Sequence, residues 1–246
     1  MKLNKYIQKS CCFYASDWHL TVMLLPYINN KVQENCSIYM KCENNIEEKM
    51  NILACKIHET REKYAKGLSN SINIELEELE MKNARFNAKI IEDKEFSPNG
   101  KSHVEFVITT NLGEEEKKLN KIASGGEMSR IMLAIKTVLS DIDEVPVLIF
   151  DEIDTGISGK AANSVGNKLK KIAQKHQVII VTHLATIAAQ GDYNYYIYKE
   201  VAANKTNTNV KLLNESETIR EIARIASGEI TEISLSHARE LRNKNV

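Results

Sequence analysis

Two adjacent carboxylates, Asp151 and Glu152, directly follow the apolar run Val147–Phe150. Such a continuous apolar run is typical of a buried parallel strand, and ligands of parallel sheets gather where the strands end. Two acids at that place are costly unless they meet a cation or a reacting group. In nucleotide hydrolysis, one such acid helps to hold Mg²⁺ and the next polarises the attacking water. A surface turn after a strand would explain the pair equally well.

A second candidate site is the segment Ser124-Gly125-Gly126-Glu127, which opens the helix expected before that strand. Two glycines let backbone N–H groups approach an anion closely, and a helix N-terminus adds its dipole and free donors. Ser124 can cap this helix. The segment therefore suits phosphate oxygens, although a plain serine cap with a glycine-rich turn has the same pattern.

Two further polar residues follow at the ends of expected strands. Asp154 lies two residues beyond Glu152, and His183 follows the apolar run Val178–Val181. A histidine there could contact a γ-phosphate or its attacking water, although a lone histidine at a strand end is more often structural. Each signal is weak alone, but their order along the chain indicates one nucleotide site.

The elements that must position these residues are predicted by hydrophobic period. Apolar residues spaced by three and four over residues 43–80 predict one long amphipathic helix with a narrow seam of the coiled-coil type. A plain surface helix on a globular core is the alternative. Alternation over residues 86–110, interrupted at Ser97–Gly100, predicts a β-hairpin.

Helices and apolar strands alternate from residue 121 onward, which implies parallel strands with crossover helices. A polar hairpin is expected over residues 193–213. Two short helices are expected near residues 215–226 and 231–243.

Composition excludes several classes of protein. The 246 residues are 43% hydrophobic and 27% charged, which is ordinary globular composition and argues against wholesale disorder. No run approaches the roughly 18 apolar residues of a membrane helix. With 33 basic and 33 acidic residues, the chain has no overall electrostatic footprint for nucleic acid, although a local basic patch can be hidden in that total.

The five cysteines all precede residue 56, and no two of them form a CxxC pair. They fit neither a zinc site nor a disulfide framework, so reduced thiols in a cytoplasmic protein are expected. The N-terminal stretch has no recognisable export signal.

The segment Lys121–Arg130 resembles the signature segment of the ATP-binding-cassette (ABC) ATPases. It is most similar to that of the RecN family, bacterial recombinational repair proteins related to the SMC chromosome proteins. The similarity continues through Phe150–Gly159 and Val181–Leu184 and covers about residues 47–243. It also includes four shorter stretches: Met81–Phe86, Val104–Phe106, Glu221–Arg224 and His237–Ala238.

This resemblance implies an α/β fold, the C-terminal lobe of an ABC-type ATPase head. Such a lobe has a parallel sheet with flanking helices plus β-hairpins, and one long coiled-coil-arm helix. The expected division is an arm helix over residues 43–80 and the lobe over residues 81–246. Residues 1–42 resemble no part of the family and stay unassigned.

The resemblance also implies a role for each candidate residue. Asp151 would be the acid on the Mg²⁺ side, Glu152 the catalytic carboxylate and His183 the switch histidine. The remaining residues would bind nucleotide, the first three of them at the γ-phosphate of ATP held by a partner subunit: Ser124, Gly125, Gly126, Glu127 and the D-loop residue Asp154.

The sequence departs from the family in one respect, because it contains no Walker A loop of the form GxxxxGK[ST]. Its one Gly-Lys-Ser, Gly100–Ser102, has Glu95 where the first glycine belongs, and it lies in the expected hairpin. In RecN-like proteins the Walker A loop lies in an N-terminal lobe. The chain therefore resembles the C-terminal half, and ATP and Mg²⁺ are both expected to need that other lobe.

Three functions remain to be weighed. The first is half of an ATPase for recombinational repair of DNA double-strand breaks, inactive alone, cytoplasmic and nucleoid-associated. Its partners would be an N-terminal RecN-type lobe or a second head, and DNA. Basic residues on the helix expected over 158–175 could contact DNA or could equally form a solvated face: Lys168, Lys170, Lys171 and Lys175.

The second is the nucleotide-binding domain of a transporter, which is disfavoured because no Walker A loop precedes Ser124. The third is a non-enzymatic truncated head that dimerises with a full-length partner and regulates it.

Overall fold

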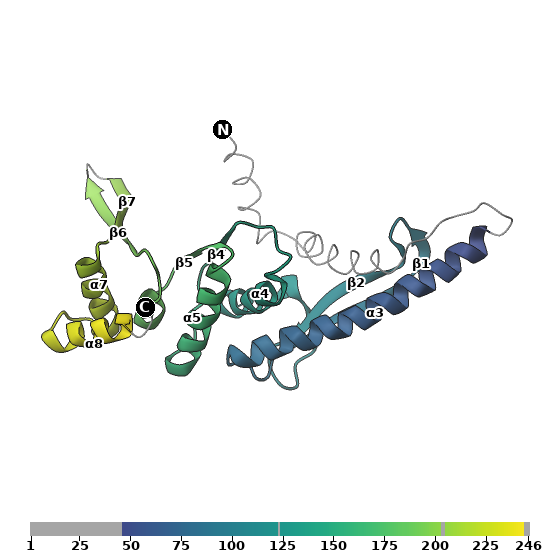
Figure 1. The fold of residues 1–246 in the computed structure, drawn as a ribbon, viewed down its shortest axis with the longest axis horizontal. Helices are drawn as coiled ribbons and strands as arrows, with labels where there is room; N and C mark the ends of the chain where they lie inside the picture. The colour runs from purple at the N-terminus through teal and green to yellow at the C-terminus, as the bar shows by residue number, and fades with distance from the viewer. Residues whose placement is uncertain (1–45, 123, 203–204, 244–246) are drawn as a thin grey trace.

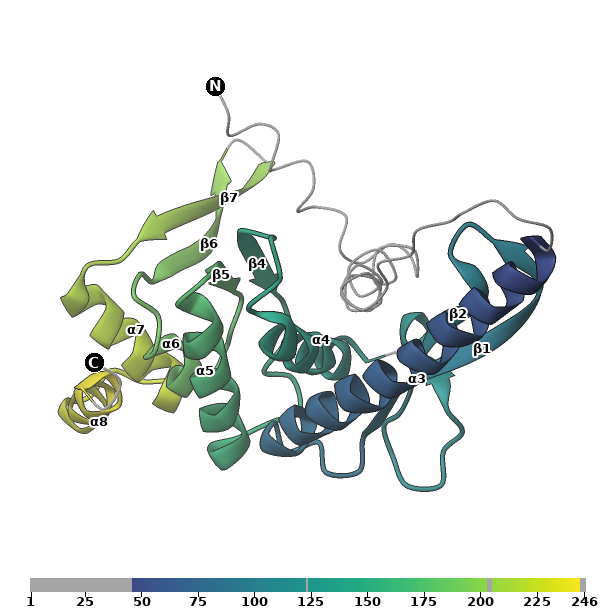
Figure 2. The same cartoon turned by 45° about the vertical axis from the view of Figure 1, so that its right-hand side comes forward.

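The computed structural model describes residues 46–122, 124–202 and 205–243 (Figure 1). The unassigned segment 1–42 lies outside these residues. Helix α3 (Ile46–Glu78) is 33 residues long and lies along an antiparallel hairpin of β1 (Arg85–Ser97) and β2 (Gly100–Thr109), as both views show (Figure 2). The predicted long helix and the predicted hairpin are therefore present.

The hairpin turns at the Ser97–Gly100 segment, where Gly100 has a φ of 101°. This left-handed backbone favours glycine, because a residue with a Cβ atom is strained at such a φ. A short strand, β3 (Lys117–Lys118), pairs with the other edge of β2 and leads into the 3₁₀ turn Leu119–Lys121.

The apolar seam of α3 packs on this hairpin. Ile72 and Leu76 are fully buried in the same core as Phe86. Ser69 Oγ accepts a hydrogen bond from the Ala88 amide at 3.0 Å, and Arg61 donates to the Asn99 carbonyl in the hairpin turn at 2.7 Å. From about Ala54, which is buried, the helix is thus attached to the lobe, as in the surface-helix alternative. A coiled-coil arm stays a prediction, which the exposed Met50 and Ile52 of the first turns suit.

The α/β core follows. Helix α4 (Gly125–Leu139) leads to β4 (Val147–Phe150), and α5 (Gly159–Ala173) crosses to β5 (Gln177–Ile180). Strands β4 and β5 are parallel, with Leu148 opposite Val178. The expected α/β fold class is therefore confirmed in its parallel strands, crossover helix, hairpins and long helix.

One expectation about this sheet is wrong. The apolar pattern predicts a buried strand at Val147–Phe150, but Ile149 is 50% exposed, and Ile179 of the neighbouring β5 is 45% exposed. Their neighbours Leu148 and Phe150 are buried. Among the described residues this sheet has two strands, and the helices of the core shield one of its faces.

The C-terminal part matches the predicted pattern. After the short α6 (Ala185–Ala188), strands β6 (Tyr195–Ala202) and β7 (Lys205–Leu212) form an antiparallel hairpin. Helices α7 (Glu215–Ser227) and α8 (Glu232–Asn243) close the described chain. Within the residues that the structure describes, no helix has the length and apolar character needed to cross a membrane.

Candidate functional site

The start of α4 is built by Ser124 and two glycines. Ser124 is the N-cap, with extended backbone, and its Oγ accepts a hydrogen bond from the Glu127 amide at 3.4 Å. A Cβ atom at Gly125 would lie 2.2 Å from Glu152 Oε2, and one at Gly126 would lie 3.0 Å from the Glu152 carbonyl oxygen. The glycines therefore allow this helix to begin in direct contact with the segment that follows β4.

The two candidate acids are exposed at the end of β4. Asp151 Oδ1 accepts a hydrogen bond from the Glu152 amide at 2.9 Å. Glu152 has a φ of 55°, in the left-handed region that non-glycine residues rarely adopt. Such backbone outliers cluster at functional sites, where the surrounding structure holds them in place.

Two side chains that the sequence analysis did not single out hold α4 to this loop. Ser129 Oγ donates to the Asp151 carbonyl at 2.7 Å. Arg130 is buried and donates to the carbonyls of Ile153, at 3.3 Å, and Thr155, at 2.8 Å. Burial lowers the pKa of Arg130, and the Glu127 carboxylate opposes that shift. Their position directly after the glycine segment is the signal that could have identified them.

Asp154 and His183 meet beyond the ends of the two parallel strands. The Asp154 side chain is buried, and its Oδ2 accepts hydrogen bonds from Thr182 Oγ1 at 2.5 Å and from the His183 amide at 2.8 Å. His183 Nδ1 lies 3.2 Å from the same oxygen, and the histidine side chain is 71% exposed.

The structure thus brings the candidate residues together in two linked groups. Gly125 contacts Glu152 across the start of α4, and Asp154 contacts His183 after β5. The loop from Asp151 to Asp154 joins the groups. The arrangement offers exposed carboxylates, a capped helix start and an exposed imidazole at neighbouring strand ends, which is suited to binding and hydrolysing a phosphate ester.

Mg²⁺ fits this site only if other molecules supply most of its ligands. No cluster of three or more His, Cys, Asp or Glu residues able to hold a metal occurs in the described part of the chain. Protein sites for Mg²⁺ commonly use one or two carboxylates together with substrate phosphates and waters. The exposed Asp151 carboxylate suits that mode, with the remaining ligands supplied by nucleotide and water.

The Gly100–Ser102 tripeptide lies in the β1–β2 hairpin. Gly100 opens β2, and Ser102 is buried, where its carbonyl oxygen accepts a hydrogen bond from Arg61 at 2.6 Å. Lys101 Nζ lies 5.3 Å from the centre of the Phe96 ring. This tripeptide therefore contributes to the hairpin and its contact with α3.

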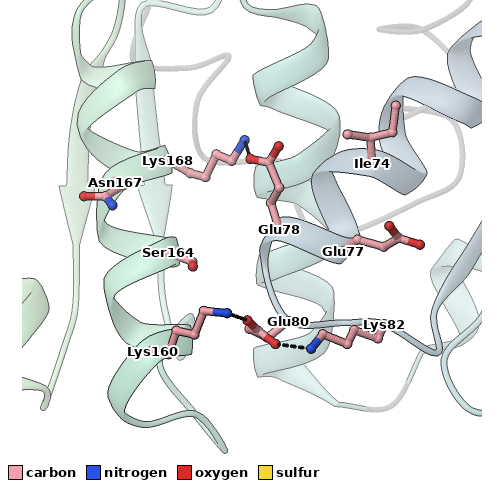
Figure 3. Close-up of a pocket in the computed structure, with 9 residues that line it drawn as sticks. All are labelled: Ile74, Glu77, Glu78, Glu80, Lys82, Lys160, Ser164, Asn167 and Lys168. Carbon is pink, nitrogen blue, oxygen red and sulfur yellow. Dashed lines mark ion pairs between the residues drawn. The ribbon is translucent and has the colours of Figure 1, made fainter.

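A separate open pocket of about 750 Å³ lies between the end of α3 and α5 (Figure 3). Its charges are paired, since Lys168 meets Glu75 and Glu78, and Glu80 meets Lys160 and Lys82. The acids outweigh the effect of burial, so the pKa of Lys168 is raised.

Lys168 and Lys175, which were considered for DNA contact, are engaged within the chain. Lys168 joins α5 to α3, and Lys175 pairs with Asp141.

Comparison with known proteins places this geometry in context. No family model matches the chain. The DNA repair protein RecN of Haemophilus influenzae is 38% identical over 210 residues, which are 85% of this chain and 38% of that protein. RecN of Bacillus subtilis is 38% identical, over 76% of this chain and 35% of that protein. RecN of Rickettsia bellii is 44% identical, over 72% of this chain and 32% of that protein.

Solved structures that resemble the chain include SMC head domains. The head of Pyrococcus yayanosii SMC, with a coiled coil and joint, has a TM-score of 0.49 at 16% identity, over 73% of this chain and 33% of that one. The SMC head of Thermotoga maritima has a TM-score of 0.33 at 19% identity, over 60% of this chain and 47% of that one.

Proposed function

Because the chain belongs to the RecN family, of whose curated members it spans about a third to two-fifths, we propose that it is the C-terminal lobe of an ABC-type ATPase head that acts in recombinational repair of DNA double-strand breaks. The proposed division is an arm segment over residues 43–80, in which α3 is the described helix, and a lobe over residues 81–246.

The observation that carries this proposal is the contact between α4 and the end of β4. Gly125 and Gly126 lie against Glu152, and Ser129 donates to the Asp151 carbonyl. A serine-capped, glycine-rich helix start and a pair of acids, which begin 25 residues after Gly126, are thus held together by direct contacts. This arrangement supports a phosphate site rather than an isolated helix cap and an isolated turn.

Each residue then has a distinct task. Asp151 would hold Mg²⁺, which supplies charge neutralisation on the phosphates when it is bound. Glu152 would orient the attacking water, and the exposed imidazole of His183 would contact the γ-phosphate or that water. The nucleotide of a facing head would be bound at the start of α4 by Ser124, Gly125, Gly126 and Glu127. The expected nucleotide contact of Asp154 does not fit its buried carboxylate, which accepts hydrogen bonds from the segment after β5 instead.

ATP and Mg²⁺ would bind with a lobe outside this sequence. A Walker A loop supplies most phosphate contacts, together with a lysine and a hydroxyl ligand for Mg²⁺, and no segment of this sequence has that form. An N-terminal RecN-type lobe would therefore complete the site. A second head would face it across the nucleotide, and the assembled cytoplasmic protein would bind DNA.

The test is ATP turnover by this chain mixed with an N-terminal RecN lobe. Glu152→Gln removes the charge but keeps the shape of the side chain, so the mixture should lose about 10²–10⁴-fold in turnover. Glu144→Gln, at an exposed position three residues before β4, is the matched control and should leave turnover unchanged. Equal rates for the Glu152→Gln mixture and the original mixture would refute the assigned role.

A non-enzymatic role is the second candidate, favoured by the uncovered face of the β4–β5 sheet. Ile149, Ile179 and Val181 are exposed there, and an uncovered apolar face and open strand edges favour association. In that case the lobe would dimerise with a full-length partner and regulate it. The two candidates differ in titration calorimetry, because only the first gives MgATP binding that depends on both lobes.

A further inference from the structure

Asp154 differs from the other acids of the candidate site in its surroundings. Its side chain is 2% exposed, whereas Asp151 and Glu152 are exposed residues. A carboxylate that is buried in this way cannot present its oxygens to a nucleotide. Burial of a charged carboxylate is tolerated only where hydrogen-bond donors surround it.

The donors come from the segment that follows β5. The Thr182 hydroxyl and the His183 amide both donate to Asp154 Oδ2, and His183 Nδ1 lies 3.2 Å from it. Three groups from two consecutive residues therefore converge on one oxygen. The Thr182 hydroxyl is further oriented because it accepts a hydrogen bond from the Leu184 amide at 3.0 Å.

We propose that Asp154 is a positioning residue for His183. Its carboxylate fixes the orientation of the imidazole and favours a proton on Nδ1, which leaves Nε2 unprotonated on the exposed side of the ring. The hydrogen bond that one ring nitrogen makes sets the protonation of the other. An unprotonated Nε2 can accept a hydrogen bond from the water that attacks a γ-phosphate, and only this use of Nε2 rests on the proposed function.

Asp154 also connects two strand ends. It lies three residues beyond Asp151 in the loop after β4, and its bonds reach the loop after β5. A displacement of the acids would therefore be transmitted to the histidine. A residue that bound nucleotide directly would not need this internal bonding.

The test is the tautomer of His183 in the full ¹⁵N-labelled chain. Two-bond ¹H–¹⁵N correlations would be recorded at a pH well above the ordinary range of histidine titration. A free neutral imidazole prefers the proton on Nε2, so a dominant Nδ1–H form of His183 is the expected result. His183→Gln identifies its signals among the six histidines.

Variants distinguish a positioning role of Asp154 from a role that only stabilises the fold. Asp154→Ala should return His183 to the Nε2–H form. Thr182→Val removes another donor to the same carboxylate and should keep the Nδ1–H form. His176, whose Nδ1 lies 2.7 Å from the Val145 carbonyl oxygen, reports whether the fold is intact in each variant.

Two results would overturn the proposal: an Nε2–H tautomer of His183 in the unaltered chain, or an Nδ1–H tautomer that persists in folded Asp154→Ala. The first of these results is measured on the unaltered chain. The proposal can therefore be refuted even if a variant fails to fold. In the two-lobe turnover assay, Asp154→Ala should lower the rate about 10- to 100-fold, with little further loss when His183→Gln is added. Absent turnover by the unaltered mixture would instead refute the proposed function and leave the tautomer result standing.

Discussion

The carboxylate of Glu152 lies directly over Gly125, so close that a Cβ atom at Gly125 would come within 2.2 Å of Glu152 Oε2. The proposed catalytic acid Glu152 and the first glycine of α4 are therefore in contact within one chain. The neighbouring Gly126 faces different atoms, the carbonyl oxygens of Glu152 and Thr155 at 3.0 and 3.1 Å from a built Cβ. The two glycines should therefore respond differently to substitution.

Gly126→Ala should lower the free energy of unfolding by about 1–3 kcal/mol, because backbone oxygens cannot move aside easily. Gly125→Ala should change it by less than about 1 kcal/mol, because the exposed end of Glu152 can rotate away and alanine favours a helix. Urea denaturation of both variants measures the difference. A Gly125→Ala variant that is less stable than Gly126→Ala would show that the Glu152 carboxylate is fixed.

Arg130→Met should destabilise the lobe by about 2–3 kcal/mol, because the carbonyls of Ile153 and Thr155 lose charged donors. Arg220→Met, at an exposed position of α7, is the matched control and should change stability by less than about 0.5 kcal/mol. Thermal unfolding of both variants provides the measurement. Similar losses would mean that the bonds of Arg130 add nothing beyond the effect of a surface arginine.

Asp143→Asn should destabilise the protein by about 3–5 kcal/mol, because it removes one partner of a buried ion pair. Lys136 and Asp143 have side chains only 2% and 6% exposed, with 2.5 Å between Nζ and Oδ2. The double variant Lys136→Met/Asp143→Leu should recover most of that loss, because it leaves no buried charge. Equal stability of single and double variants in denaturant titrations would contradict this account.

Stability should also rise with pH through Lys136. Burial lowers its pKa, against the opposing effect of Asp143, so the folded state gives up this proton at lower pH than the unfolded state. Between the lowered pKa and the ordinary value of about 10.4, the unfolded state binds more protons and stability increases with pH. The test compares unfolding free energies of the unaltered chain and Lys136→Met across that range. A difference that falls as pH rises would contradict the predicted direction.

Local features of the fold could be predicted from the sequence. The turn at Ser97–Gly100, the period-two strands beside it, the serine cap of α4 and the short apolar strands all follow from short-range chemistry. Each of these depends on residues close together in the chain, so a pattern over a few positions contains the information. The order of the candidate residues also indicated a common site before their positions were known.

The burial of each face of the β4–β5 sheet depended on the tertiary structure. The hydrogen-bond partners of the polar side chains depended on it as well. The sequence pattern predicted a buried strand at Val147–Phe150, but Ile149 is half exposed, because burial depends on what packs against the sheet. The family resemblance implied that Asp154 binds nucleotide, yet its carboxylate faces inward to donors 28 and 29 residues away. The sequence by itself therefore determined the elements and the order of the acids, glycines and histidine. Only the folded chain decided which of them face outward, because burial and hydrogen bonding depend on contacts between segments that are distant in the sequence.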